Sequence, residues 1–573
     1  MKIHYLYLVI LLFCTSCSDF LDREPESSPM SGTFYGSETE MNLGLTGLYS
    51  TIKWEDPSLS NKVTLQATTI GFDDFGLERK PELAEGNYKT NHSMVQAFWK
   101  YAYKTVQCAN AYIHGIERGK ESVSPVKYNT MQSEARIIRT WAYFWLINLF
   151  GDVPLITSEL KSEEFYNQKM TSKDEIVRYL YEELDAAAAH LDWLPSQKGR
   201  VSRSVAYGLK ARIAFYYKDY QTAANAAKTI IENAGLGLAP VFLELYQYTG
   251  QARNTNNEIM FELMYSTEQF NSWNWYGMIT ASRNANSYSG TFPNQNLIDQ
   301  FECVDGKRID ESPLYDPQNP GKYRDQRLKY SISMPRDTIS SFSKPDFIYD
   351  IHNSITKFKN STTGEWTAGT NLDYSNIYGP RLNGVGYLFG KYSYGNKSEQ
   401  IDQSRHSYIF MRYAEILLTY AEAKIELNQL DDDVVAAIDL VRTRAGQPTV
   451  VQSGVDISSQ YEMRRLVRRE RNVELAGEGF RWFDIRRWGI AEIVMRGSVY
   501  GYASTSENIN KMQIPGFSGN GEINDMNNIP TYRDTEYRLK RDNRIFEVPK
   551  HYLFPIPQSE LDLSKTLDQN EGW

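Results

Sequence analysis

The sequence predicts a mostly α-helical protein in which paired helices pack against an irregular, loop-rich region with short strands. Three observations lead to this fold class. Several segments repeat apolar residues at helical spacing, two segments of about 34 residues resemble helical hairpins, and long stretches rich in Gly, Asn, Ser, Tyr and Trp lack such periodicity. A chain of 573 residues is also long enough to bury a large core.

The first residues are expected to be a processed leader. An apolar run at residues 5–13 is shorter than the roughly 20 residues that a membrane-spanning helix needs. The small residues Thr15 and Ser16 precede Cys17, which resembles a bacterial lipoprotein signal. We therefore expect a signal peptide at residues 1–16, lipidation of Cys17 and a tether at residues 17–36. The alternative is an ordinary secretory signal in which the cysteines are incidental.

Only two of the four cysteines, Cys108 and Cys303, lie outside this leader. Two cysteines cannot form a disulfide framework, so we expect two separate buried thiols, with a single bridge between them as the alternative.

The body, residues 37–573, is expected to be one unit whose helical scaffold occupies about 37–240 and 408–490. Helical periodicity is clear at residues 94–118, 129–150 and 171–191. The two hairpins are predicted at residues 202–235 and 411–446, where alanines recur and allow helices to approach closely.

The loop-rich part, about 240–407 and 490–573, is predicted to carry the ligand site. Aromatic residues make up 13% of the chain, too many for disorder, so these stretches are expected to be ordered loops. Long ordered loops are uncommon and are often functional.

Composition and motifs exclude several functional classes. A net charge of −9 disfavours a nucleic-acid partner, which would need a basic surface. The signatures of zinc proteases, serine hydrolases and nucleotide-binding loops are absent, and the seven histidines are not spaced as metal ligands. We therefore expect no catalytic residues, no metal and no cofactor.

The densest motif is a run of arginines and glutamates at residues 468–488. Glu470, Glu474 and Glu478 recur every four residues among arginines. A catalytic interpretation would make two of these carboxylates an acid and a base. Nearby guanidinium groups lower a carboxyl pKa, which is wrong for a general acid, so a structural role as arginine partners is favoured.

This run resembles the SusD/RagB family pattern RRER-x-x-E-x-x-x-E-G-x-R-x-x-D-x-x-R-W. Further segments resemble the family in the same order along the chain: residues 134–144, 151–155, 199–201, 305–308, 324–328, 412–423 and 567–573.

The resemblance implies a SusD-like fold with tetratricopeptide-like hairpins on one side and a glycan-presenting loop region on the other. It implies a lipid-anchored, surface-exposed protein of the bacterial outer membrane. Such a protein captures oligosaccharides for a SusC-like TonB-dependent transporter and catalyses no reaction.

Candidate ligand contacts follow from the chemistry of sugars, whose apolar C–H faces stack on aromatic rings while their hydroxyl groups need polar partners. Residues 268–292 interleave such side chains, and the resemblance adds the loop at residues 71–79. Trp366, in a Gly- and Asn-rich loop, is a further candidate. The predicted ligand-binding residues are Trp273, Trp275, Tyr276, Tyr288, Asn274, Asp73, Asp74, Arg79 and Trp366. The alternative is that some of these aromatic side chains belong to the core.

Two other functions stay open at this point. A surface glycoside hydrolase would need two carboxylates in the aromatic region that act as acid and base. A helical scaffold for peptide or protein cargo would use its hairpins for recognition, with the aromatic residues serving only as core.

Overall fold

A computed structural model describes residues 34–54, 64–79, 81–160, 164, 166–265, 274–393, 397, 399–518 and 529–573. The expected leader, Cys17 and most of the expected tether therefore lie outside the described residues. None of the helices in the described ranges combines the length and the hydrophobicity that crossing a bilayer demands.

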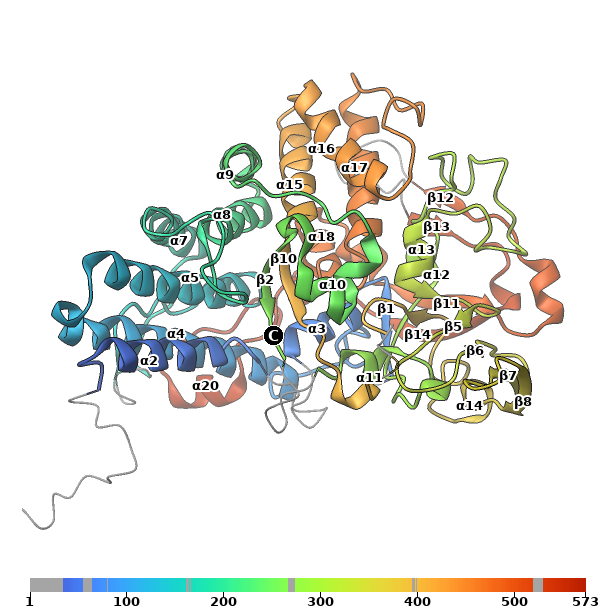
Figure 1. Cartoon of the computed structure of the whole chain (residues 1–573), viewed down its shortest axis with the longest axis horizontal. Coiled ribbons are helices and arrows are strands. Elements are labelled where there is room, and N and C mark those ends of the chain that lie inside the picture. Colours follow the sequence, from blue (N-terminus) through green and yellow to red (C-terminus); the bar gives the residue numbers. More distant parts are fainter. Residues whose placement is uncertain are drawn as a thin grey trace, which may run out of the picture.

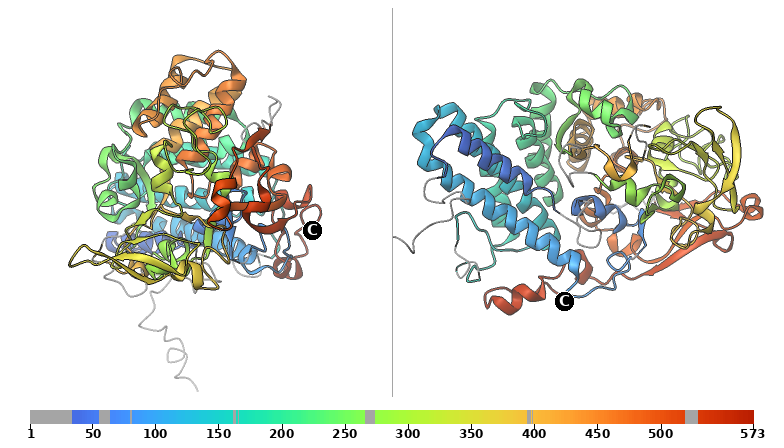
Figure 2. Two further views of the ribbon diagram at one scale, coloured as in Figure 1. Left: turned by 90° about the vertical axis from the view of Figure 1, so that its right-hand side faces the viewer. Right: turned by 60° about the horizontal axis from the view of Figure 1, so that its bottom comes forward.

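One half of the molecule is built from antiparallel helices that pack in chain order (Figure 1). Figure 2 shows the same long helices lying side by side when the bottom of the molecule comes forward. The long helices are α2 (Glu38–Ser50), α4 (Ser93–Gly115), α5 (Pro125–Leu149), α7 (Lys173–Ala188), α8 (Arg203–Tyr217), α9 (Tyr220–Asn233), α15 (Tyr413–Glu426), α16 (Asp432–Arg444) and α17 (Gln460–Glu474). The prediction of a mostly α-helical fold is confirmed.

Both predicted hairpins are present. Helices α8 and α9 pack against each other, and so do α15 and α16. Asp219 forms the turn of the first hairpin, because its side chain accepts a hydrogen bond from the N–H of Thr222 and caps α9. The second hairpin begins later than predicted, since Met411 and Arg412 end a strand and the helix starts at Tyr413.

The other half consists of short helices, small antiparallel sheets and loops, which lie to the right in Figure 1. The sheets pair β1 (Gly76–Glu78) with β3 (Thr291–Pro293), β2 (Ile259–Leu263) with β10 (Tyr408–Arg412), β4 (Ile332–Ser333) with β9 (Leu388–Phe389), β11 (Gly497–Ala503) with β14 (Arg538–Arg544), and β12 (Gly516–Ser518) with β13 (Ile529–Thr531). A four-stranded sheet joins β5 (Thr338–Ile339), β6 (Phe347–Ile348), β7 (Ile355–Lys359) and β8 (Trp366–Thr370) in that order.

Short helices connect these sheets to the scaffold. They are α3 (Leu65–Thr68), α10 (Tyr248–Arg253), α11 (Tyr276–Thr280), α12 (Gln295–Ile298), α13 (Gln326–Ser331), α14 (Leu372–Ser375), α18 (Arg481–Arg487), α19 (Ala491–Val494) and α20 (Gln558–Leu563).

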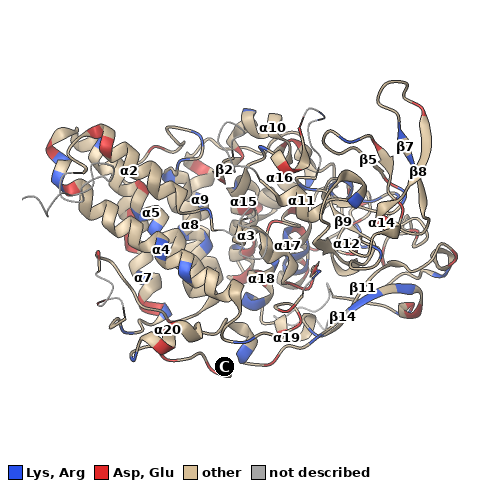
Figure 3. Cartoon of the chain, turned by 90° about the horizontal axis from the view of Figure 1, so that it is seen from below, with Lys and Arg blue, Asp and Glu red and all other residues tan. Residues whose placement is uncertain are grey.

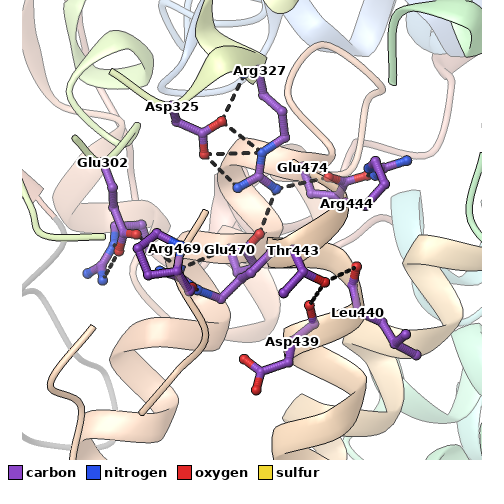
Figure 4. A network of polar contacts seen from close by, with 12 residues as sticks. Glu302, Asp325, Arg327, Asp439, Leu440, Thr443, Arg444, Arg469, Glu470 and Glu474 are labelled. Atoms are coloured by element: carbon purple, nitrogen blue, oxygen red, sulfur yellow. Dashed lines mark hydrogen bonds and ion pairs between the residues drawn. The ribbon is translucent and has the colours of Figure 1, made fainter. Parts of the chain in front are cut away.

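A buried network of ion pairs joins the two halves at the arginine- and glutamate-rich run (Figure 4). Glu474, at the end of α17, pairs with Arg327 at 2.9 Å, with Arg412 at 2.5 Å and also with Arg444. Burial alone would raise the pKa of Glu474, but the guanidinium groups of Arg444, Arg412 and Arg327 outweigh it and hold the pKa well below its usual range. The structural interpretation of this run is therefore confirmed for Glu474.

The other two glutamates of the run are held in the same way. Glu470 pairs with Arg327 at 2.6 Å, and Glu478 pairs with Arg412 at 2.8 Å and with Lys391 at 2.7 Å. All three carboxylates are buried, so the run fastens α17 to β10 and α13 and presents no acid to solvent.

The two cysteines of the body are free thiols, and no bridge joins them. Cys303 is buried, and Cys108 is partly exposed on α4.

Candidate functional site

Two predicted aromatic residues lie together at the surface of the loop-rich half. Tyr288 is 44% exposed, and its ring packs edge-on against the ring of Trp275, with 5.7 Å between the centroids. Trp275 is half-buried and fixed in place, because its Nε1 donates a hydrogen bond to the carbonyl of Asp402 at 2.9 Å. One face of this pair is therefore open to solvent, while the other is held by the protein.

The turn that carries Tyr288 is held rigidly. Asn286 adopts a φ of +69°, in the left-handed region that asparagine tolerates. The N–H of Tyr288 donates to the carbonyl of Met278 at 2.7 Å. Ser287 lies between Asn286 and Tyr288, and its hydroxyl donates to the carbonyls of Met278 and Ala281. The turn is anchored to α11, which leaves the ring of Tyr288 to project outward.

The loop after β1 and a third aromatic residue complete the group. Arg79 donates a hydrogen bond from Nη1 to the carbonyl of Tyr288 at 3.4 Å. Its guanidinium also lies 4.8 Å from the ring centroid of Tyr378, a side chain that is 48% exposed. We call Arg79, Trp275, Tyr288 and Tyr378 the aromatic surface. The structure thus brings three of the predicted residues together, since Arg79 joins Trp275 and Tyr288.

A buried carboxylate supports this surface from beneath. Asp373 in α14 accepts hydrogen bonds from the hydroxyl of Ser282 at 2.6 Å, the N–H of Arg283 at 2.8 Å and the amide of Asn284 at 2.8 Å. Burial raises the pKa of Asp373 to about 6, although these hydrogen bonds oppose the rise. Asp373 therefore fixes the segment before Tyr288 to the segment before Tyr378.

Tyr276 and Asn274 correct the prediction for their positions, because both side chains are buried. Tyr276 is 0% exposed, and its hydroxyl donates to the carbonyl of Gly477. The amide of Asn274 donates to the carbonyl of His406, and its oxygen accepts from the N–H of Tyr276. Both serve to dock α11 on the core, so neither offers a face to a ligand.

Asp73 and Asp74 are also buried and are not available as ligand contacts. Asp73 accepts hydrogen bonds from the N–H groups of Phe75 and Gly76, at 2.9 and 3.0 Å. Asp74 forms a two-pronged ion pair with Arg481, at 2.7 and 2.8 Å. Within the loop at residues 71–79, Asp73 therefore stabilises its own turn and Asp74 pairs with the scaffold. Of the residues predicted in this loop, only Arg79 reaches the aromatic surface.

Two predicted tryptophans stand apart. Trp273 lies outside the described residues. Trp366 is 41% exposed at the start of β8, opposite Lys359 on β7, and no ring contact joins it to the aromatic surface within the described chain. Its role in binding stays a prediction.

Tyr378 is the contact that sequence reasoning missed. Residues 374–381 read Tyr-Ser-Asn-Ile-Tyr-Gly-Pro-Arg, which mixes aromatic side chains with Asn and Arg as residues 268–292 do. The same pattern could therefore have identified this segment, but only the fold brings it beside Arg79.

A separate hollow of about 520 Å³ lies between α4 and α20. Its walls include Trp99, Tyr103 and Glu560, and none of the predicted site residues lines it. In the described ranges, no group of three or more His, Cys, Asp or Glu side chains is arranged to hold a metal ion.

Family models match both parts of the chain. Residues 257–573 match the model described as the SusD family, and residues 19–215 match the model described as starch-binding and associating with the outer membrane. SusD-like protein P25 of Formosa agariphila is 25% identical over 555 residues, covering 89% of this chain and 94% of that protein. SusD-like protein P2 of the same organism is 26% identical over 498 residues, covering 84% and 89%.

Solved structures share the fold. A SusD-like carbohydrate-binding protein from Bacteroides fragilis has a TM-score of 0.77 at 25% identity, covering 94% of this chain and 100% of that one. Surface glycan-binding protein A from Bacteroides fluxus has a TM-score of 0.64 at 18% identity, covering 94% and 100%, a likeness of fold alone. The family model covers more than half of the chain, and the chain belongs to the SusD family.

Proposed function

We propose that this protein is a surface glycan-binding protein that captures oligosaccharides on its aromatic surface and passes them to a SusC-like TonB-dependent transporter, without catalysing a reaction. The observation that carries the proposal is the exposed pair of tyrosines, Tyr288 and Tyr378, held on either side of Arg79. Membership of the SusD family and the 25% identity to a carbohydrate-binding protein support it.

The geometry suits a sugar chain. Tyrosine rings at the surface offer flat apolar faces to the C–H groups of a pyranose, and such contacts contribute beyond the area that they bury. The ring of Tyr288 packs against Trp275, whose Nε1 donates to the carbonyl of Asp402, and the turn at Tyr288 is anchored through its main-chain N–H, so little freedom is lost on binding. Arg79 supplies hydrogen-bond donors beside these faces.

The acids near the aromatic surface argue against hydrolysis. Asp373 is fully buried and already accepts three hydrogen bonds, and the glutamates of α17 are engaged by arginines. A glycoside hydrolase needs two accessible carboxylates that flank the scissile bond. Incubation of a bound oligosaccharide with the protein is therefore expected to release no reducing sugar.

Membrane attachment is proposed to occur through a lipid on Cys17. The supporting observations are the lipoprotein-like leader and the match to a family described as associating with the outer membrane. Growth of the producing bacterium with a labelled fatty acid should label the protein, and C17S should abolish the label and release the protein from the outer membrane. Equal labelling of wild type and C17S would overturn this part of the proposal.

Transfer to a SusC-like transporter is tested separately. Purification of the protein from its own membranes in mild detergent should recover a TonB-dependent transporter with it. Recovery of the lipidated protein with no such transporter would argue against the partnership.

The binding experiment uses the full chain in detergent and isothermal titration against a panel of oligosaccharides. Y288A should lower the affinity for the bound glycan by about tenfold, equivalent to about 1.4 kcal/mol. W275A should do the same, and thermal unfolding checks that this half-buried residue has not destabilised the protein. The matched control is Y323A, because Tyr323 is 51% exposed but makes no contact with the aromatic surface. Equal affinity in Y288A and Y323A would remove this surface as the site.

A further inference from the structure

We propose that the oligosaccharide is anionic, with carboxylate or sulfate groups that Arg79 and Arg283 bind. This inference rests on the proposed function and specifies the class of glycan that the aromatic surface takes.

Two arginines at this surface lack an acidic partner. Arg79 uses one N–H on the carbonyl of Tyr288, and Arg283 uses one on the carbonyl of Ser287 at 2.7 Å. Neither forms an ion pair with a carboxylate in the described part of the chain. Both residues are partly exposed, and neither has a fully buried side-chain nitrogen that lacks a hydrogen-bond partner.

The two cations also lie close to each other. Burial lowers the pKa of Arg283, and the positive charge of Arg79 lowers it further. The two like charges repel each other, although each arginine also donates to a main-chain carbonyl. A bound anion between them would remove that repulsion and gain charge-assisted hydrogen bonds.

Three buried arginines behave differently. Arg327, Arg412 and Arg442 each contact two or more carboxylates. Carboxylates thus neutralise these three guanidinium groups, whereas Arg79 and Arg283 donate to main-chain carbonyls, as the buried Arg324 does.

The acids near the aromatic surface do not neutralise Arg79 and Arg283 through ion pairs in the described part of the chain. Asp373 is fully buried and accepts a hydrogen bond from the main-chain N–H of Arg283; its charge opposes the lowering of the Arg283 pKa, but it forms no ion pair with the guanidinium. Asp402 holds Trp275 through its main-chain carbonyl and forms no ion pair with Arg79 or Arg283 within the described residues.

A third arginine of the loop-rich half, Arg381, also has no acidic partner among the described residues. The guanidinium of Arg381 lies 4.3 Å from the ring centroid of Tyr374, and no carboxylate of the described chain pairs with it. Its loop is held by Arg541, which donates to the carbonyls of Arg381 and Leu382. Figure 3 shows further Lys and Arg residues on β7 and on the β11–β14 ribbon at the same end of the molecule.

The arrangement also fits the chemistry of an acidic sugar. A guanidinium presents a planar fork of donors that matches a carboxylate or a sulfate. Tyr288 and Tyr378 lie beside Arg79, so a sugar ring can stack while its acidic substituent meets the arginine. A uronic acid and a sulfated sugar share this chemistry.

The test compares charged and neutral oligosaccharides of matched length. Isothermal titration of the full chain in detergent would use oligogalacturonate and its methyl ester, chondroitin sulfate oligomers and their desulfated, carboxyl-reduced form, and neutral maltohexaose and laminarihexaose. We expect one charged probe to bind at least about tenfold more tightly than its neutral counterpart, and the affinity to fall as salt rises. Desulfated chondroitin oligomers that keep their carboxylates distinguish the two sources of charge.

Variants assign the effect to the two arginines. R79Q and R283Q should each lower the affinity for the charged probe by about tenfold and weaken neutral binding by a smaller factor, while R283K should retain part of the affinity for the charged probe because the charge remains. R178Q is the matched control, since Arg178 is an exposed arginine on α7. Tight binding of a neutral glycan, indifferent to R79Q, R283Q and salt, would overturn the inference and leave the proposed function standing. Failure of every probe to bind would overturn both.

Discussion

Arg79 donates a hydrogen bond to the main-chain carbonyl of Tyr288, a residue 209 positions later in the chain. The same guanidinium lies over the ring of Tyr378. One side chain therefore organises three loops that are far apart in sequence, and the binding proposals depend on this arrangement.

The support beneath the aromatic surface can be tested at Asp373. D373A leaves three hydrogen-bond donors without their acceptor, and each buried one costs about 1–3 kcal/mol. We expect the variant to unfold at lower urea concentration and to lose glycan affinity, because Arg283 and Tyr378 lose their common anchor. D373N should recover only part of the stability, because both oxygens of Asp373 accept hydrogen bonds and asparagine keeps one acceptor oxygen.

The control for that experiment is D350A. Asp350 accepts hydrogen bonds from His352 and Asn353 in a neighbouring turn and does not contact the aromatic surface. The D350A variant should lower the stability of the protein slightly and leave its glycan affinity unchanged. A D373A protein that binds as tightly as wild type would show that Asp373 does not position the site.

The buried network should be sensitive to the loss of one carboxylate. E474Q removes the charge that three arginines share, and breaking a buried pair in this way costs about 3–5 kcal/mol. Urea unfolding followed by circular dichroism measures the change. E462Q on the same helix removes a partly exposed acid 3.4 Å from Arg465 and should cost less than about 1 kcal/mol. Equal effects of the two variants would contradict the role given to Glu474.

The stability of the protein should depend on pH through Asp73. Burial raises the pKa of Asp73 from 3.8 to about 7, and the nearby charge of Asp74 adds to this. The folded state therefore binds more protons than the unfolded state between about pH 4 and pH 7, so this residue's contribution to stability falls as pH rises through that window. D73N keeps the oxygen that accepts from Phe75 and removes the charge.

We expect D73N to gain stability relative to wild type as pH rises from 4 to 7, by about 2–4 kcal/mol in total. Urea unfolding at a series of pH values measures this difference. D456N should show almost no change between pH 4 and pH 7, because hydrogen bonds from Ser458 lower the pKa of the exposed Asp456 and its titration lies below this window. A difference between D73N and wild type that does not change with pH would rule out the titration of Asp73.

Trp366 offers a test of ligand length. Trp366 is the first of the five residues of β8, a strand of about 15 Å that leads to α14. Only a long oligosaccharide could therefore touch both Trp366 and Tyr378. W366A should weaken the binding of long chains and leave short ones unaffected, with a change in stability below about 0.5 kcal/mol. Equal loss for short and long chains would place Trp366 within the aromatic surface itself.

Helix periodicity in the sequence predicted the scaffold well, because a helix repeats its buried face every three or four residues and its hairpins are local in the chain. The arginine- and glutamate-rich run was also interpretable in isolation, since each carboxylate lies within a turn of an arginine. The partners that the structure supplies, Arg327 and Arg412, come from elsewhere in the chain.

The loop region was less predictable from the sequence. Tyr276 and Tyr288 occur in the same kind of aromatic, Asn-rich stretch, yet one is fully buried and the other is 44% exposed. No regular period relates the exposure of a loop residue to its position, so only long-range contacts decide which ring faces water.

The sequence by itself therefore determined the helical scaffold, the family and the loop-rich region in which a ligand site was expected. Only the tertiary structure decided that Asp73, Asp74, Asn274 and Tyr276 serve the interior, and that Arg79, Tyr288 and Tyr378 meet at the surface. The physical reason is that a binding surface made of loops depends on contacts between distant segments, whereas a helix is specified by its neighbours in the chain.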